Sequence, residues 1–272
     1  MNKKNFFSDK TKGMAILYMV MVGFVLLCMV TQIWLGEFEN VFTCVLTLFL
    51  FLIPTIANRT FKITLPHTLE VIIVFFIFSA EILGEINAFY EKISWWDSML
   101  HAMNGFLMAG VGFSMVDILN QSDRVKMSLS PIFVVIVAFC FSMTIGVLWE
   151  FFEFGMDLFA NTDMQKDYVL NAISSVSLDK TLSNTQIEIT GIEDVMLIGQ
   201  NLNLAGQPVE GGKYLMGLGG YLDIGIFDTM KDMIVNFIGA VVFSIIGYFY
   251  LKGRGKGTFA KRFIPHMNKS KL

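Results

Sequence analysis

Several carboxylates, together with one histidine and one asparagine, are placed at helical spacing inside or at the ends of long apolar segments. Ionisable side chains are costly within a membrane, and they normally face the interior of a helix bundle or water. Residues three, four or seven positions apart share one face of a helix. The candidate site residues, in chain order, are Glu81, Glu85, Asp97, His101, Glu150, Glu153, Asp157, Asp228, Asp232 and Asn236.

This donor set is suited to a cation. Carboxylate oxygens with one imidazole can bind a divalent ion, and Mg²⁺, Mn²⁺, Ca²⁺ and Zn²⁺ are the candidates. The acids greatly outnumber the nearby bases, His101 and Lys231, so we expect bound protons or a bound metal to offset their charge. The first-choice ligands are Asp97, His101, Glu150, Glu153, Asp157, Asp228 and Asp232, and the second-choice ligands are Glu81, Glu85 and Asn236.

Simpler roles compete with a shared site. Asp97 and Asp228 could be N-caps of their helices, and Glu81 with Glu85 could face an aqueous vestibule. Glu150 is harder to explain in this way, because apolar residues precede it and Trp149 adjoins it. If a metal activates water, Glu150 or Glu153 is the candidate general base.

The composition indicates what must hold these residues. The chain has 272 residues, of which 54% are hydrophobic and 16% are charged. Soluble domains carry roughly 25% charged residues, and a soluble core of this size could not bury so much apolar surface. We therefore expect an integral membrane protein. The net charge of −3 gives no indication of a nucleic-acid partner.

About six apolar segments approach the length of a membrane-spanning helix. They cover residues 14–35, 41–57, 68–90, 97–116, 131–159 and 227–251. The first is too long for the apolar core of a signal peptide, so we expect an uncleaved helix. Trp95 and Trp96 are expected to be interfacial anchors. The predicted fold class is an all-α membrane bundle with a small, partly β extracytoplasmic insert.

The insert is the polar stretch 160–222. Residues 185–190 alternate polar and apolar side chains, which is typical of a strand, and residues 195–198 are a second candidate. A disordered loop is the alternative. The expected organisation is an N-terminus (1–13), five helices (14–159), the insert (160–222), a sixth helix (223–251) and a basic tail (252–272).

The distribution of Lys and Arg predicts the orientation. Most of the 20 basic residues fall in the N-terminus, the tail and the loops after the second and fourth helices. The positive-inside rule places these segments, with both termini, in the cytoplasm of a cell (inner or plasma) membrane. Alternate helices run in opposite directions, so all the candidate site residues would fall in the outer half of the bilayer.

The same residues carry a resemblance to a known family. The matching pieces are Trp95-Trp96-Asp97 with His101 and Gly105, Trp149-Glu150-Phe151-Phe152-Glu153 with Asp157, Asn161-Thr162-Asp163-Met164-Gln165, and Asp228-Thr229-Met230-Lys231-Asp232 with Asn236 and Gly239-Ala240. Over roughly residues 81–240 the chain resembles the YjdF-like family of inner-membrane proteins, a family of unknown function. A looser similarity is to VanZ-like proteins.

The resemblance implies a membrane location and a shared polar site, and it implies no reaction. Typical YjdF-like members have a much shorter loop where this chain inserts most of residues 165–221. The outer face of this chain therefore departs from the family pattern.

The sequence leaves three functions open. The first is a cation- or proton-binding carrier or transporter, although paired broken helices and an inverted repeat are not apparent. Six helices would need a homo-oligomer to form a pathway. The second is a membrane-embedded metal-dependent hydrolase of a lipid or envelope substrate. The third is a non-catalytic envelope or assembly protein whose insert, 160–222, binds an extracytoplasmic partner.

Overall fold

The computed structural model describes residues 12–60, 63–120, 129–253 and 260–267. The chain divides into two compact units. The first comprises Met1–Trp149 and Asp232–Leu272, and the second comprises Glu150–Lys231.

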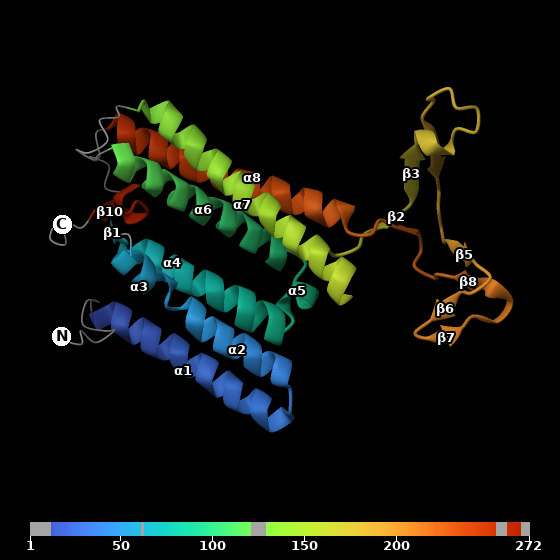
Figure 1. Ribbon diagram of the computed structural model, residues 1–272, viewed down its shortest axis with the longest axis horizontal. Helices are drawn as coiled ribbons and strands as arrows, with labels where there is room; N and C mark the ends of the chain where they lie inside the picture. The colour runs from blue at the N-terminus through green and yellow to red at the C-terminus, as the bar shows by residue number, and fades with distance from the viewer. Residues whose placement is uncertain (1–11, 61–62, 121–128, 254–259, 268–272) are drawn as a thin grey trace. The chain divides into compact units, whose positions relative to one another are not determined.

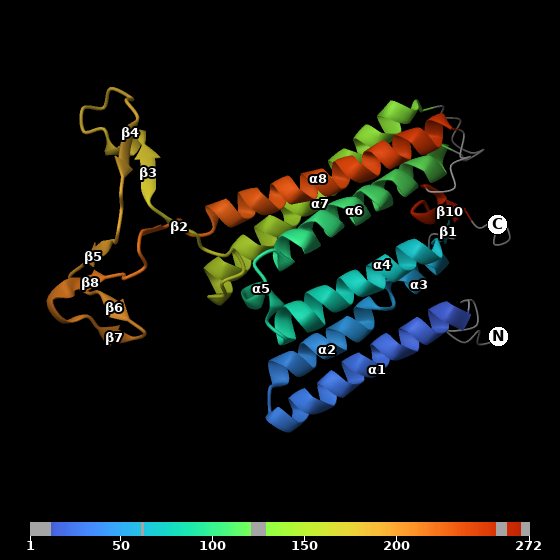
Figure 2. The ribbon, with the colours of Figure 1, turned by 180° about the vertical axis from the view of Figure 1, so that it is seen from behind.

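Long helices make up the first unit, and they lie side by side along a common direction (Figures 1 and 2). The described helices of the chain are α1 (Lys12–Leu35), α2 (Phe38–Leu50), α3 (Ile53–Thr60), α4 (His67–Phe78), the π-helix η1 (Ser79–Ile86), α5 (Phe89–Lys92), α6 (Trp96–Asn120), α7 (Pro131–Ala160) and α8 (Ile226–Lys252).

Five described helical stretches are long and apolar enough to cross a membrane. They are Lys12–Leu35, Phe38–Thr60, Trp96–Asp117, Pro131–Ala160 and Ile226–Lys252. The predicted class, an all-α membrane protein, is thereby confirmed. The predicted third helix is also helical, but its second half, η1, has π-helical hydrogen bonding, and the helix ends at Ile86 instead of residue 90.

The predicted second helix is interrupted. Residues 51–52 form a turn between α2 and α3. Pro54 explains the break, because proline has no backbone N–H and its ring clashes with the carbonyl group four residues earlier. The side chain of Trp96, which was expected to be an interfacial anchor, packs against the protein. It is 8% exposed, its indole packs edge-on against Phe89, and its Nε1 donates to the carbonyl oxygen of Ser79 at 3.3 Å.

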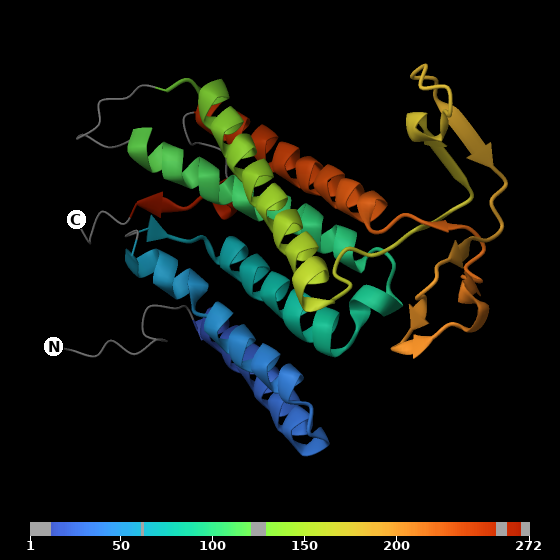
Figure 3. The same ribbon diagram turned by 45° about the vertical axis from the view of Figure 1, so that its right-hand side comes forward.

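A short antiparallel ladder joins two distant segments at one end of the first unit. Strand β1 (Ile63–Thr64) pairs with β10 (His266–Met267). The N-terminus of α4 and the C-terminus of α8 lie at this same end of the bundle (Figures 1 and 3). The preceding 3-10 helix η4 (Ala260–Arg262) contributes Ala260 to an apolar core formed with α6, α7 and α8. The basic tail is therefore folded against the bundle at residues 260–267.

Two apolar cores organise the helices of the first unit. One is built on α1, α2, α4 and η1 and includes Tyr18, Val25 and Val74. The other lies among α6, α7 and α8 and includes Phe113 and Phe243. Buried leucines of α4 and α6 pack between them: Leu65, just before α4, Leu69 and Leu107.

Short antiparallel strands follow α7 in the second unit. Their bounds are β2 (Val169–Leu170), β3 (Ala172–Ser175), β4 (Ile187–Thr190), β5 (Met196–Ile198), β6 (Asn203–Leu204), β7 (Gln207–Pro208), β8 (Lys213–Leu215) and β9 (Tyr221–Leu222). Strand β2 pairs with β9, β3 with β4, β5 with β8 and β6 with β7. Both strands expected from the sequence are present, as β4 and β5.

Candidate functional site

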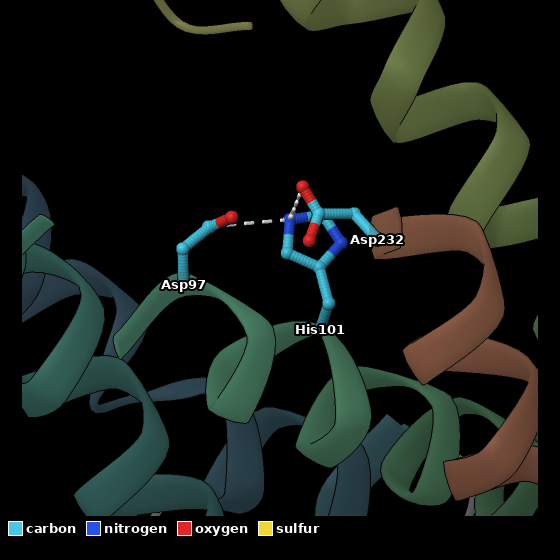
Figure 4. A group of neighbouring side chains, drawn as sticks. All are labelled: Asp97, His101 and Asp232. Atoms are coloured by element: carbon cyan, nitrogen blue, oxygen red, sulfur yellow. Dashed lines mark ion pairs between the residues drawn. The ribbon is translucent and has the colours of Figure 1, made fainter. Parts of the chain in front are cut away.

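Two carboxylates from different helices converge on one imidazole nitrogen (Figure 4). The Nε2 atom of His101 lies 3.5 Å from Oδ1 of Asp97 on the same helix, α6. It lies 3.9 Å from Oδ2 of Asp232 on α8. One ligand atom from each of the three residues lies within 4.8 Å of the others. We call these three residues the Asp–His–Asp cluster.

The cluster is largely screened from solvent. The side chains of His101 and Asp232 are 7% and 2% exposed, whereas that of Asp97 is 23% exposed. Asp97 lies in the first turn of α6, where the helix dipole stabilises negative charge. His101 follows one turn later on the same face. Asp97 therefore forms the more accessible edge of the cluster, and His101 and Asp232 form its interior.

Close contact between α6 and α8 positions these side chains. A Cβ atom placed on Gly239 would lie 2.9 Å from the backbone nitrogen of Phe106 and 3.0 Å from the carbonyl carbon of Ala102. A Cβ atom on Gly105 would likewise meet the backbone of Asn236. Small residues allow membrane helices to approach this closely. Both glycines lie within two turns of the cluster on their helices.

A layer of buried polar contacts lies beside this helix contact. The amide nitrogen of Asn104 donates to Oδ1 of Asn236 at 3.1 Å. Ser142 on α7 donates its hydroxyl to the backbone carbonyl of Gly105 at 2.7 Å. Asn236 is 1% exposed and Ser142 is fully buried. These hydrogen bonds tie α6, α7 and α8 together, and Asn236 lies in a buried polar network.

Asp157 and Asp228 have other partners. Asp157 accepts hydrogen bonds from the backbone nitrogens of Met164 and Gln165 at 2.6 and 2.9 Å. Asp228 accepts from the backbone nitrogen of Lys166 at 2.9 Å and from Nζ of Lys231 at 2.7 Å. Within the second unit, these acids therefore fasten the segment after α7 to the start of α8.

The remaining predicted ligands lie outside the Asp–His–Asp cluster. Glu81 is half-buried and Glu85 is exposed, and both lie on η1. Glu150 and Glu153 are buried and belong to the second unit. They continue the face of α7 that carries Ser142, because they follow it by eight and eleven residues. Their participation in cation binding stays a prediction.

Sequence reasoning missed two buried acids at the other end of the first unit. Glu70, in the first turn of α4, accepts a hydrogen bond from the hydroxyl of Tyr18 at 3.1 Å. Asp117 lies just beyond the predicted fourth helix (97–116), but α6 continues to Asn120 and Asp117 is 5% exposed. Glu70 lies one turn before Val74 on an apolar face, and this spacing was the available signal.

The fold and the cluster define a multi-pass helical membrane protein with buried polar side chains in its bundle. A sequence profile described as "Predicted membrane protein (DUF2238)" matches residues 15–182. The chain belongs to this family. The match includes Asp97 and His101 and ends before Asp232.

A protein of Thermotoga maritima, named "Uncharacterized protein", is 29% identical to this chain over 124 residues. The matched region covers 46% of this chain and 55% of the relative, so the chain spans about half of the relative's length. No solved structure gives a significant match. The narrower YjdF-like and VanZ-like resemblances are not among these findings and stay predictions.

Proposed function

We propose that this protein binds a cation at the Asp–His–Asp cluster, either a divalent metal ion or a proton shared among the three side chains. The convergence of two carboxylates on Nε2 of His101 is the observation that carries the proposal. A nitrogen atom donates a good hydrogen bond at about 2.7–3.2 Å, and both separations here are longer. They are closer to the separations between two ligands of one metal ion.

The spacing leaves room for an ion. If the two carboxylate oxygens are no more than 4.8 Å apart, a point equidistant from all three atoms lies ~2.0–2.4 Å from each. Zn²⁺ binds nitrogen and oxygen at about 2.0–2.2 Å, and Ca²⁺ binds oxygen at about 2.3–2.6 Å. The imidazole favours Zn²⁺ over Mg²⁺ and Ca²⁺, and the two carboxylates also suit Mn²⁺. Water would complete the coordination.

Transport of the bound cation is the extension that we favour over catalysis. The Asn104–Asn236 pair continues the polar face of the cluster further into the bundle. Beyond it, the rings of Phe106, Phe113 and Phe243 pack edge-to-face with centroids 5.1 and 5.8 Å apart. This aromatic layer separates the cluster from the opposite end of the bundle. A carrier would have to open that layer during each cycle.

Metal analysis of the full-length protein in detergent tests the proposal. We expect about one equivalent of Mn²⁺ or Zn²⁺ after dialysis, and Asp97→Asn, His101→Gln and Asp232→Asn should each weaken binding at least about tenfold, as loss of one direct ligand implies. Asp117→Asn is the matched control, because it removes a buried acid ~30 Å further along the same helix.

The proton version predicts a different result. No metal would bind, but proton flux into proteoliposomes would depend on His101 and Asp232 and persist in Asp117→Asn. A protein that binds no metal, and whose proton flux is absent or unchanged in the cluster variants, would refute the proposal. The proposal would also be contradicted if Asp117→Asn lost as much bound metal as the cluster variants.

We also propose a cell-membrane location with both termini in the cytoplasm and the insert outside. The antiparallel pairing of β1 with β10 supports this topology, because the loop after α3 and the C-terminal tail must then lie on one side. Both segments are basic in sequence, and basic segments favour the cytoplasmic side. The cluster near the first turns of α6 and α8 would then lie in the outer half of the membrane.

An assembly role is the second candidate. The strands of the insert leave apolar side chains exposed, such as Ile198 (73%), Leu215 (56%) and Met196 (53%). Exposed apolar side chains of this kind are typical of a surface that another protein covers. Binding of an envelope partner that is lost when residues 172–215 are replaced by a short linker, with metal content unchanged, would favour this role. The hydrolase hypothesis stays a prediction that first requires a bound metal.

A further inference from the structure

An apolar groove lies between α7 and α8 at the end of the first unit where α7 begins and α8 finishes. Its volume is about 330 Å³. One wall is formed by Ile132, Ile136 and Phe139 of α7, and the other by Val241, Ile245 and Tyr248 of α8. Neither the Asp–His–Asp cluster nor its polar layer contributes to the lining. The groove is therefore a separate feature, and the inference drawn from it does not depend on the cation proposal.

The depth of the groove corresponds to one leaflet of a bilayer. Val241 and Phe249 mark its extent along α8, which is ~12 Å at 1.5 Å per helical residue. Half of a ~30 Å hydrocarbon core is ~15 Å. At the deep end, the ring of Phe139 packs edge-on against Phe237 with centroids 5.3 Å apart. A single extended acyl chain of one leaflet would fill such a groove.

The shallow end of the groove carries a positive charge. The Nζ atom of Lys252, in the last turn of α8, lies 5.6 Å from the ring centroid of Tyr248. Lys252 is exposed, and its aliphatic stem can follow the helix while the ammonium reaches the interface. Tyrosine and lysine are typical of the headgroup level of a membrane. An ammonium at the mouth of an acyl-sized groove complements a lipid phosphate.

We propose that this groove is a binding site for an anionic phospholipid, with one acyl chain between α7 and α8 and the phosphate beside Lys252. The charge at the groove mouth favours a lipid over a second copy of this chain, whose apolar helices would place no anion there. The lipid fits the leaflet that faces β1 and β10, since α8 finishes at that end of the bundle (Figure 1).

Native mass spectrometry of the full-length protein tests this site. Phosphatidylglycerol and phosphatidylcholine with identical acyl chains are added separately. We expect phosphatidylglycerol to bind about fivefold more tightly, the effect of one lysine near an anionic headgroup. Lys252→Gln should remove this preference. Lys12→Gln is the matched control, because Lys12 is an exposed lysine at the start of α1 and does not line the groove.

A second pair of variants tests the groove itself. Ile245→Trp fills the groove with a larger side chain and should lower the binding of both lipids at least fivefold. Val242→Trp is its control on the same helix, because Val242 is similarly exposed (46% against 52%) but does not line the groove. If Ile245→Trp does not fold, Ile136→Trp on the facing wall makes the same test.

Several results would overturn the proposal. Equal binding of the two lipids would do so, as would a loss in Lys12→Gln equal to that in Lys252→Gln. Unchanged lipid binding in the groove-filling variants would exclude an acyl chain there. If Ile245→Trp converts a dimer into a monomer and leaves lipid binding intact, a second copy of the chain occupies the groove instead.

Discussion

Replacing Gly239 with alanine should disturb the proposed cation site without changing any of its proposed ligands. The added Cβ would lie 2.9 Å from the backbone nitrogen of Phe106 and 3.0 Å from the carbonyl carbon of Ala102. Non-bonded carbon atoms prefer separations of about 3.5–4.0 Å. Backbone atoms of a helix cannot move aside individually, so α6 and α8 must separate by roughly 0.5–1 Å.

The separation would act on both stability and binding. Overpacking of this kind costs about 1–3 kcal/mol in free energy of unfolding. His101 adjoins Ala102, so the 3.9 Å separation between its Nε2 and Asp232 would increase as well. Functional constellations tolerate displacements of only about 0.5 Å. We therefore expect metal or proton affinity at the cluster to fall at least about tenfold, the equivalent of ~1.4 kcal/mol.

Thermal unfolding and metal titration in detergent measure the two effects. Gly23→Ala is the matched control, because a Cβ atom on Gly23, in α1, meets nothing within 4 Å. That change should leave cation affinity unaltered and could raise stability by up to ~1 kcal/mol through helix propensity. If Gly239→Ala keeps the parent unfolding temperature, the two helices do not approach this closely. If stability falls while affinity stays unchanged, the glycine contact does not position the cluster.

Three further perturbations test other parts of the structure. Tyr18→Phe removes the hydrogen bond to Glu70 and should lower the free energy of unfolding by about 0.5–1.5 kcal/mol in denaturation experiments. Hydrogen bonds from Thr181 and Ser183 hold the pKa of Asp179 below its usual value, so the stability that it contributes is present above the unfolded pKa of about 3.9 and is lost as the pH falls toward the folded value. Hydrogen exchange should show that the backbone amides of this loop lose protection when the pH is lowered. In Asp179→Asn, these amides should lack protection at neutral pH as well as at acidic pH. Equal protection in the variant and in the parent protein would contradict the assignment. Leu182→Cys, at a position 92% exposed, should react with a membrane-impermeant maleimide on intact cells, and labelling only after lysis would invert the proposed topology.

This sequence predicts the presence of each helix more reliably than the residues at which the helix begins and ends. The apolar runs that become α1, α7 and α8 predict their bounds to within two residues, because a membrane span has a required length and composition. Asp117 shows the limit of this reasoning. A charged residue after an apolar run looks like a loop, but here the neighbouring helices bury it and α6 continues for another three residues.

Two of the three residues of the Asp–His–Asp cluster could be predicted from local spacing. Asp97 and His101 are four residues apart, so a helix necessarily places them on one face. Asp228 and Asp232 have the same spacing, and the sequence cannot rank them as partners of His101. The structure separates them through Lys231, which pairs with Asp228 at 2.7 Å, while Asp232 points toward the imidazole. Selection between two acids on one helix face depends on tertiary contacts that periodicity does not encode.

The packing around the cluster constrains how a cation could cross the membrane. Transport requires a second arrangement of the helices that opens the aromatic layer below the Asn104–Asn236 pair. The α6–α8 contact is made between backbones at Gly105 and Gly239, so these helices cannot rotate past one another without separating. The interface between α4 and α6 is different in kind, because it consists of leucine side chains such as Leu69 and Leu107. Side-chain contacts of this kind can slide by small rotamer changes. Phe106 of the aromatic layer also packs against these leucines. Movement of the α1–α4 half against the α6–α8 half would therefore free this ring to leave the layer, while the proposed cation ligands stay in place.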